Sequence, residues 1–565
     1  MRNQPLCPPP TRIHVADLRP RTRLLLLFAG GLLFSGVVHA QTARYELGRR
    51  VRSMEEAWEA NRDPLIRRAA LPPIKRAVES FFALRLPAAA KELDEARLVL
   101  EGKAESALGK AGDGNTGVSP AEKRTATAES SAAAARTREL AARRWSAALS
   151  FEPTRRLLDP HVDTHLRIDV RLFYAVTAPP TDNIRLAFNL RTIDGQKLTT
   201  VEIAAASDEP VPAPSDVAKA EWRREARLPL DVAMANQDCR LEGIAIVDGT
   251  SYSLGSTGVS LAADLTERLA ALRMPLNDTR SENLLTLQEH LRVLEALAGG
   301  RTLETDYPAY RLLEEASVSH QQLRQTSVTP GDSEKSQDPS KLADGKRLSV
   351  GQHWRVITGS QGSSCTTRLL IPATAANGTQ QAVESRPLVV AVHGAGGSEN
   401  MFFDAYGAGK IVRLCESRGW ILVAPRQGLF GGIGIRWDEL VAGVTRLAAV
   451  DNARVYLVGH SLGAMQAARL ADSAERKPAF VAALGGGGRI GRFEPLRDVP
   501  FFVGVGDQDF GRGGGQQLAE QLRRGGIRDV RFREYADTEH LTIVQVALDD
   551  IFQQWDERDA ALRMR

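Results

Sequence analysis

The sequence predicts an α/β fold for the C-terminal part of the chain, preceded by a helical region and by a small antiparallel β domain with the pattern of a sandwich. Two observations support this expectation. Short apolar runs typical of buried strands lie at 387–392, 454–458 and 500–505, and a helix-forming stretch directly follows the second of them. Between His165 and Leu261, apolar and polar residues instead alternate with a period of two, which is typical of strands with one buried face.

Residues 41–160 are predicted to form a helical N-terminal region, because they are rich in Ala, Leu, Glu and Arg and show helical periodicity. Leu71-Pro72-Pro73 interrupts this periodicity, so we expect a helix to break there. Further along, Ser119-Pro120-Ala121-Glu122 combines an N-cap, a first-turn proline and a capping-box glutamate. This combination predicts that another helix begins at that point.

The predicted β domain covers residues 161–262. Apolar residues alternate with charged ones over 165–172, and a second alternating stretch follows at 184–190. Asp194-Gly195 and Asp248-Gly249 are turn signals that favour hairpins between such strands.

A helical segment is predicted over 263–325, and its best-defined part lies within Ser281 to Ala298, where four leucines form one apolar stripe that Gly299-Gly300 ends. Residues 326–346 are polar and rich in Pro, Ser, Asp and Lys, which predicts a linker. The four leucines of the stripe within Ser281 to Ala298 are Leu284, Leu287, Leu291 and Leu294. Residues 347–565, after the linker, make up the α/β domain.

Length and composition set the outer limits of the interpretation. A chain of 565 residues is too long for one hydrophobic core, so several domains are expected. The net charge of +4, with 25% charged residues, gives no reason to expect a nucleic-acid partner. No repeated four-stranded unit is visible in the sequence, which argues against a propeller beside the α/β domain.

The N-terminus has the pattern of a secretory signal. Arginines at 19, 21 and 23 precede an apolar run from Leu24 to Val38, and Val38-His39-Ala40 has the small-x-small form of a cleavage site. An uncleaved anchor is the alternative, but the run is short for a membrane span, which needs about 20 residues. We therefore expect cleavage after Ala40, a secreted or periplasmic protein, and no stable membrane insertion after cleavage.

Loss of Cys7 with the signal would leave three cysteines, an odd number that allows at most one bridge within the chain. Cys365 and Cys415 are the natural pair because they share the α/β domain, whereas Cys239 lies in the β domain. Single buried thiols are an equally good interpretation.

Chemistry is indicated most clearly by Gly459-His460-Ser461-Leu462-Gly463, which joins an apolar strand to a helix-forming stretch. A serine on such a tight turn projects its hydroxyl from the sheet edge, and the flanking glycines let strand and helix pass closely. The helix N-terminus behind Ser461 offers backbone N–H groups to an oxyanion. The plain alternative is a Gly-rich turn before a helix, but the strand and helix on either side favour a nucleophile.

Three further segments complete a known pattern. The strand at 500–505 ends in Gly506-Asp507-Gln508-Asp509, a late loop carries His540, and an upstream strand leads into His393-Gly394-Ala395-Gly396-Gly397. With these motifs, residues from about 352 to 555 resemble an α/β-hydrolase. They are most similar to compact esterases of the dienelactone hydrolase and polyhydroxybutyrate depolymerase-like type. The rest of the chain does not contribute to this resemblance.

The resemblance implies a role for each matching residue. Ser461 would be the nucleophile and His540 the base, and the acid lies three residues beyond Gly506, which favours Asp509 over Asp507. Asp507 would then be a loop cap. His393 and His460 are given no catalytic role, and neither a metal nor a cofactor is implied. The oxyanion donors would be the backbone N–H groups of Ala395 and Leu462. Two aromatic residues, Phe402 and Trp437, are candidates for walls of the acyl pocket or, equally, for ordinary core residues.

The expected function is that of a secreted serine esterase acting on a small or polymer-linked carboxylic ester. The alternative from another class is a non-catalytic binding protein of the same fold. Within the enzymes, acyl transfer and peptide hydrolysis use the same triad and stay open.

The accessory region has no assigned role in the sequence. Polymer binding by its β domain would need a row of exposed aromatic residues, and the segment has only scattered ones, so a structural or dimerising role is favoured and a homo-oligomer formed through this region stays open. The aromatic residues in question are Phe173, Tyr174, Phe188, Trp222 and Tyr252.

Overall fold

The computed structural model describes most of the chain. The described residues are 41–102, 120–176, 181–205, 222–276, 281–326, 347–373, 385–428 and 432–563. Within these ranges, side chains are described everywhere except at 120–131 and 326. The predicted signal at 1–40 and residues 327–346 of the predicted linker lie outside the described ranges.

An eight-stranded sheet forms the centre of the C-terminal domain, in the order β16-β15-β14-β13-β11-β12-β10-β9. All pairs from β12 across to β16 are parallel, whereas β10 pairs antiparallel with both β12 and β9. The α/β fold predicted for this domain is therefore confirmed. The strands are β9 (Gly351–Thr358), β10 (Ser364–Ile371), β11 (Arg386–Val392), β12 (Ile421–Pro425), β13 (Val450–His460), β14 (Phe480–Leu484), β15 (Phe501–Gly506) and β16 (Val530–Tyr535).

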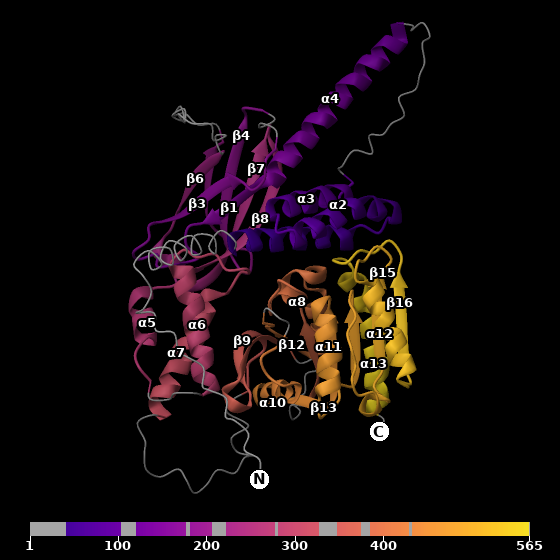
Figure 1. The fold of residues 1–565 in the computed structure, drawn as a ribbon. Helices are drawn as coiled ribbons and strands as arrows, with labels where there is room; N and C mark the ends of the chain where they lie inside the picture. The colour runs from indigo at the N-terminus through magenta and orange to yellow at the C-terminus, as the bar shows by residue number, and fades with distance from the viewer. Residues whose placement is uncertain are drawn as a thin grey trace, which may run out of the picture.

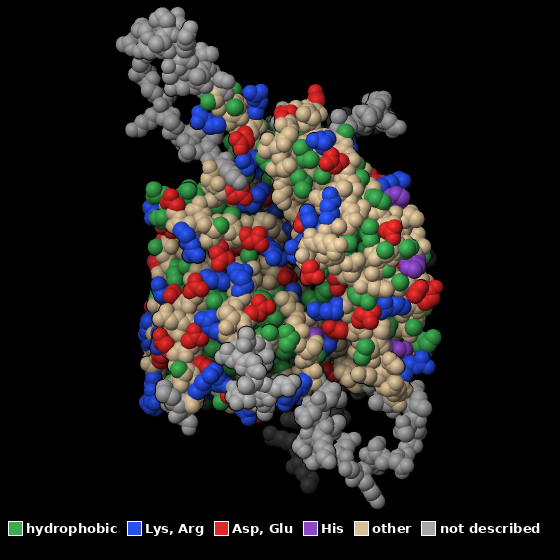
Figure 2. Space-filling view, turned by 180° about the vertical axis from the view of Figure 1, so that it is seen from behind, with side chains coloured by type: hydrophobic (Ala, Val, Ile, Leu, Met, Phe, Trp, Pro, Cys, Tyr) green, Lys and Arg blue, Asp and Glu red, His purple; other side chains and the backbone are tan. Residues whose placement is uncertain are grey.

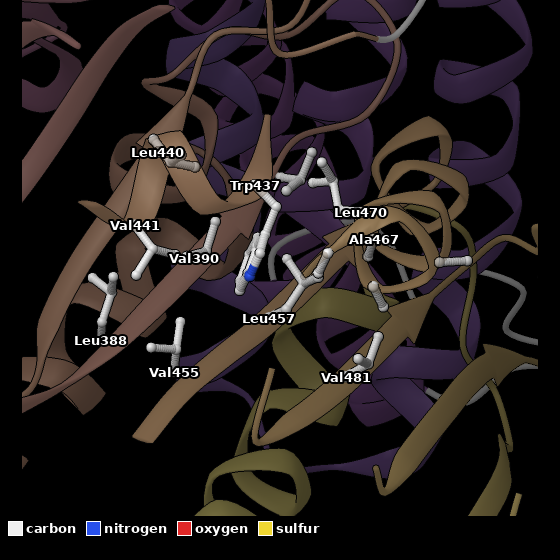
Figure 3. Packing of buried hydrophobic residues seen from close by; sticks show 14 of the residues in the cluster. Leu388, Val390, Trp437, Leu440, Val441, Val455, Leu457, Ala467, Leu470 and Val481 are labelled. Carbon is white, nitrogen blue, oxygen red and sulfur yellow. The ribbon is translucent and has the colours of Figure 1, made fainter. Parts of the chain in front are cut away.

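Helices cover both faces of this sheet, which explains why its strands are continuous apolar runs. Leu388 and Val390 of β11 lie in the cluster shared with α10, α11 and α12, and Val389 and Ala391 lie in the cluster shared with α9 and α13. Figure 3 shows the first cluster, where Trp437 packs among strand side chains. The helices are α8 (Met401–Asp404), α9 (Lys410–Arg418), α10 (Trp437–Leu447), α11 (Leu462–Ser473), α12 (Arg512–Arg524) and α13 (Ile543–Arg563).

The cysteines of the α/β domain do not pair. Cys365 on β10 belongs to the cluster on one face of the sheet, and Cys415 on α9 belongs to the cluster on the other face. These two residues and Cys239 are free, buried thiols. The sheet itself separates the pair that the sequence suggested.

A β-sandwich precedes this domain. A three-stranded sheet (β1-β3-β6) and a five-stranded sheet (β2-β8-β7-β4-β5) enclose one hydrophobic core. Asp248 and Gly249 connect β7 and β8 with positive φ values of 48° and 81°, which suits the tight hairpin predicted there. The strands are β1 (Leu149–Pro153), β2 (Leu157–Leu158), β3 (His165–Leu172), β4 (Ile184–Thr192), β5 (Lys197–Ala204), β6 (Arg223–Pro229), β7 (Gln237–Val247) and β8 (Thr250–Leu261).

The β domain is mainly antiparallel, as predicted. Its strands begin at Leu149, earlier than the predicted range of 161–262, and the two-residue strand β2 adds one short parallel pair with β8. Both early strands are too short to show a period of two in the sequence. The scattered aromatic residues pack inward: Phe188 is fully buried, and the Trp222 ring lies edge-on to Trp145.

The N-terminal helices form a layer whose core also takes in Ala405 of the C-terminal domain. It consists of a helix over residues 41–60, α2 (Pro64–Phe82) and α3 (Leu86–Leu100). The break expected at Pro72 and Pro73 was wrong, since α2 runs through both. Burial of neighbouring residues such as Leu71 and Ile74 offsets the hydrogen bonds that these prolines cannot make. A long helix, α4 (Pro120–Ala148), starts at the predicted proline and leads directly into β1.

A second group of helices joins the sandwich to the edge of the large sheet. It comprises α5 (Leu265–Leu272), α6 (Glu282–Ala298) and α7 (Ala309–Thr326). Helix α6 begins after the Ser281 N-cap and ends at Gly299, as its leucine stripe predicted. Its His290 is within 2.9 Å of the Trp354 carbonyl on β9, and Arg355 pairs with Glu315 of α7 at 2.8 Å.

Figure 1 shows how these parts are arranged: α2 and α3 lie across one end of the α/β domain, and α4 projects away from the body. The seam between the layers contains ion pairs, including Arg68 with Asp537 at 2.7 Å and Arg413 with Glu59 at 2.7 Å. Figure 2 shows Lys, Arg, Asp and Glu interspersed over the face seen from behind. Among the described helices, none has both the length and the apolar character needed to cross a membrane.

Candidate active site

Ser461 lies on the tight turn between β13 and α11, where its backbone has φ 57° and ψ −118°. A positive φ is unusual for a residue that has a Cβ and indicates local strain. The turn is held in part because the Ser461 amide donates a 2.8 Å hydrogen bond to the Leu484 carbonyl of β14. Because α11 begins at the next residue, the hydroxyl is presented at the carboxyl end of the strand, beside the helix N-terminus.

Two glycines make this turn possible. A Cβ on Gly459 would overlap the Gly463 carbonyl, and a Cβ on Gly463 would overlap the Val392 carbonyl of β11. Both obstacles are backbone atoms, which cannot move aside without disturbing the sheet. The glycines of the motif are therefore required by the close passage of β13, α11 and β11.

Ser461, His540 and Asp509 form one hydrogen-bonded series. The Ser461 Oγ lies 3.0 Å from His540 Nε2, and His540 Nδ1 lies 2.7 Å from Asp509 Oδ1. The same Asp509 oxygen accepts a 2.6 Å hydrogen bond from the Gly511 amide, and the side chain of Asp509 is fully buried. This arrangement leaves His540 Nδ1 as the donor to the carboxylate and Nε2 as the acceptor for the serine proton.

Asp507 has a different environment two residues earlier. Its Oδ1 accepts a 3.2 Å hydrogen bond from the Thr538 amide, in the loop that leads to His540. A Cβ on the preceding Gly506 would overlap the Thr538 carbonyl, so this glycine lets the two loops approach. Asp507 thus ties the histidine loop to the end of β15, while Asp509 contacts the imidazole.

The loop after β11 lies opposite Ser461. His393 shapes it, since His393 Nδ1 donates to the Gly394 carbonyl at 2.8 Å and Nε2 accepts from the Gln427 amide at 3.0 Å. The Gly394 amide donates to the Tyr406 hydroxyl at 3.3 Å. Within the described part of the chain, the amides of Ala395 and Leu462 have no acceptor in the protein, so both are free to bind an oxyanion.

His460 supports the imidazole of His540 from behind. Its Nε2 donates to the His540 carbonyl at 2.9 Å, and burial lowers the pKa of His460 to about 3. The imidazole is therefore neutral over the physiological range and acts as a fixed hydrogen-bond donor. His393 and His460 both hold loops in place.

Glu539 precedes His540 and is almost fully buried. Desolvation raises the pKa of its carboxyl group from 4.5 to about 7, although the Leu541 amide donates a 2.8 Å hydrogen bond to it. Burial also raises the pKa of Glu55, which lies on the helix over 41–60 and interacts electrostatically with Glu539. Two carboxyl groups at this seam are therefore held in the neutral form above their usual pH range.

This environment makes stability depend on pH. Folded Glu539 keeps its proton up to about pH 7, whereas the unfolded chain loses it near 4.5, so the contribution of Glu539 to the free energy of unfolding is fully present below about pH 4.5 and is lost as pH rises through 7. The loss is on the order of 3 kcal/mol. We expect Glu539→Gln to remove this part of the pH dependence, because the amide can still accept from Leu541. Urea unfolding of both proteins at pH 5 and pH 8 tests this, and an unchanged difference between the two pH values would contradict it.

A cavity of about 230 Å³ opens beside Ser461 and His540. Its floor is the loop at 394–397, with Met401 and Tyr406, and its roof comes from the N-terminal layer. The residues of that roof lie on the helix over 41–60, on α2 and on α3, and they include Leu47, Val51, Ala77, Val78, Phe81, Phe82, Ala89 and Leu93.

The proposed pocket walls on Phe402 and Trp437 were wrong, since neither residue lines this cavity. Phe402 is fully buried on one face of the sheet, and Trp437 packs on the other, where its indole N–H donates to the Arg476 carbonyl at 3.0 Å. Sequence reasoning also missed Phe510. Its ring centroid lies 4.0 Å from that of His540, and 64% of the side chain is exposed.

No cluster of three or more His, Cys, Asp or Glu residues suited to a metal occurs in the described stretches.

Gly485 makes room for the carboxylate of Asp509. Asp509 Oδ2 has no hydrogen-bond partner among the described residues, and a Cβ on Gly485 would lie 2.9 Å from this oxygen. No local signal in the sequence marks Gly485, because its function depends on strands that meet only in the fold.

A known protein family matches the C-terminal region of this chain. Residues 389–564 match the model of the alpha/beta hydrolase family. Similar solved structures include the fluorophosphonate-binding serine hydrolase F of Staphylococcus aureus (12% identity, 36% of this chain and 98% of that chain, TM-score 0.31). A ferulic acid esterase is also similar (14% identity, 37% of this chain and 100% of that chain, TM-score 0.31). So is a thermostable esterase (12% identity, 72% of this chain and 99% of that chain, TM-score 0.32). No curated protein matches the sequence. With the sheet order and the strand–serine–helix turn, the family match shows that residues 389–564 of this chain belong to the α/β hydrolase family.

Proposed function

We propose that this protein is a serine esterase that cleaves a carboxylic ester through a covalent acyl-enzyme. The observation that carries the proposal is the hydrogen-bonded series of Ser461, His540 and Asp509 beside a cavity of apolar character. A weak nucleophile, a base in contact with it, and a buried acid that orients the base are the requirements of acyl transfer.

In the first half of the reaction, Ser461 Oγ attacks the ester carbonyl carbon and His540 Nε2 takes the hydroxyl proton. Negative charge forms on the carbonyl oxygen, where the amides of Ala395 and Leu462 donate to it. Asp509 stabilises the imidazolium. When the bond to the alcohol oxygen breaks, His540 passes its proton to the departing alcohol, which leaves the acyl group on Ser461.

In the second half, water takes the place of the alcohol. His540 removes one proton from the water as its oxygen attacks the acyl carbon, and the same two amides bind the oxyanion again. The bond to Ser461 Oγ then breaks and the serine recovers its proton from His540. The products are a carboxylic acid and free enzyme.

The test is a panel of p-nitrophenyl esters with increasing acyl length, assayed on the chain from residue 41 onward, together with a fluorophosphonate probe. Turnover of at least one ester and labelling of the protein are expected. Absence of both would overturn the proposal and favour a non-catalytic binding protein. Added alcohols and p-nitroanilides test the other enzyme classes: new ester would indicate an acyltransferase, and amide cleavage a peptidase.

We also propose export of the protein, supported by the arginines, apolar run and small-x-small site before Gln41. The mature protein is expected to begin at Gln41. Mass spectrometry of protein recovered from the periplasm or medium of the expressing cells checks this, and an intact N-terminus in the membrane fraction would contradict it.

A further inference from the structure

The N-terminal helical layer supplies the roof over Ser461, although it lies outside the region that matches the family. Val51, Val78 and Phe81, each on this layer, line the same cavity as Ser461 and the oxyanion loop. Phe81 lies directly against that loop: a Cβ placed on Gly396 would lie 3.0 Å from its ring. The chemical site therefore has one wall from the hydrolase domain and another from a segment more than 300 residues earlier.

The layer is fixed on the hydrolase domain by several contacts. Arg68 of α2 forms a bidentate pair with Asp537 at 2.9 and 2.7 Å, in the loop that carries His540. The Gln545 side chain of α13 donates to the Glu55 carbonyl at 3.3 Å. These contacts hold the roof in a preformed position, which lowers the cost of binding a substrate under it.

The position of the cavity indicates which half of an ester it receives. The carbonyl oxygen must point to the Ala395 and Leu462 amides, and the alcohol must leave next to His540. On the His540 side lies Phe510, whose ring packs edge-on against Phe82 of α2 at 5.5 Å; Phe510 is still 64% exposed, so that side keeps an opening to solvent. The enclosed part instead lies between the oxyanion loop and α2, where Phe81 meets Gly396. The acyl group is the half that extends there.

The chemistry of the walls favours a neutral, apolar group. Six charged residues line the cavity, and four of them have partners within the protein: Arg49 pairs with Glu46 at 3.1 Å, Arg52 with Glu56 at 3.1 Å, Asp404 with Arg368 at 2.7 Å, and Asp306 accepts from Tyr45 at 2.7 Å. Of the other two, Glu304 has a pKa raised by burial, and Arg44 is exposed to solvent. A buried anionic group would find these charges already compensated and would lose its hydration. The remaining walls named above are aliphatic or aromatic.

The size of the cavity indicates which groups fit inside it. A cavity of about 150 Å³ is enough to bind benzene, and this one measures about 230 Å³. By this comparison it accommodates one aromatic ring or an aliphatic chain of similar or somewhat greater bulk, on the order of six to eight carbons.

We propose that the N-terminal helical layer forms the acyl-binding site of this enzyme and selects esters of neutral, apolar carboxylic acids of benzoyl to octanoyl size. The inference rests on the proposed esterase function and goes beyond it, because it gives the accessory region a direct part in choosing the substrate.

The test changes the roof without touching the groups that react. Val78→Phe, on α2, fills the cavity, and Val99→Phe, on α3, is the matched control, since Val99 is also partly buried in the layer but does not line the cavity. Val78→Ala enlarges the cavity and gives a second test of the inference if the phenylalanine variant does not fold. Each protein is assayed on p-nitrophenyl acetate, hexanoate, octanoate and benzoate, and on acetates of alcohols of increasing length.

For Val78→Phe we expect kcat/KM to fall at least tenfold on hexanoate, octanoate and benzoate and less than threefold on acetate. Val78→Ala should move the optimum toward longer acyl chains, and Val99→Phe should leave the profile as in the parent. An unchanged acyl profile in both Val78 variants would overturn the inference, as would a change confined to the alcohol series. A parent protein inactive on every ester and unlabelled would instead overturn the esterase function itself.

Discussion

Ser461→Ala is expected to abolish ester turnover while leaving the fold intact. The loss in kcat should be about 10⁶-fold, the size of the effect of removing the nucleophile from a serine protease triad. Ser461 Oγ is hydrogen-bonded to His540, and the strained turn around it is held by the backbone and by Gly459 and Gly463, so alanine is tolerated there. Steady-state kinetics and fluorophosphonate labelling measure the effect, with circular dichroism as the check on folding.

A control on the same helix separates this loss from a general effect of removing a hydroxyl group. Ser473 is the last residue of α11, and its Oγ donates to the Leu470 carbonyl at 3.3 Å. Ser473→Ala should keep parental activity and labelling. Labelling that persists in Ser461→Ala would identify another serine as the nucleophile.

Asp509→Asn is expected to reduce kcat about 10⁴-fold in a folded protein, because an amide cannot hold His540 in the required tautomer or stabilise the imidazolium. The carboxylate is buried and lies 2.7 Å from His540 Nδ1. The Gly511 amide, which donates to the same oxygen, keeps an acceptor in the variant if the side-chain carbonyl of the introduced asparagine takes that position.

Asp507→Asn is the matched control for this prediction, with the same chemical change two residues away. Its side chain accepts from the Thr538 amide, and asparagine can still do so. We expect most of the activity to remain and any loss of stability to stay within about 1 kcal/mol. Kinetics and urea unfolding of both variants decide between the two aspartates, and reversed phenotypes would make Asp507 the triad acid.

Local patterns in the sequence were sufficient wherever neighbouring residues decide the structure. The turn around Ser461 was predictable because strand, glycines and helix are contiguous, and the structure has this turn between β13 and α11. The hairpin at Asp248-Gly249 and the helix after Ser281 follow from the same kind of local preference. Motif order also limited the acid to Asp507 or Asp509, and the fold places the second of these against His540.

Local patterns were insufficient where packing across the chain outweighs them. Pro72 and Pro73 lie inside α2 because the layer buries the residues around them. Phe402 and Trp437 are apolar residues near the right motifs, but an apolar residue beside a doubly covered sheet gives no sign of which face it packs on. Cys365 and Cys415 were suggested as a pair only because they share a domain. The sheet places them on opposite faces, and no apolar pattern in the sequence shows which face each of them joins.

The sequence by itself thus predicted the α/β fold of the C-terminal domain and the turn around Ser461, because these follow from short segments whose own residues set their conformation. The roles of His540 and Asp509 came from the resemblance to a known family, through the order of its motifs. Only the tertiary structure decided what surrounds them. Val78 and Phe81 reach the cavity beside Ser461 and His540 through contacts between segments more than 300 residues apart. Such contacts depend on how whole layers pack, and that packing minimises exposed apolar surface over the entire chain rather than in any one segment.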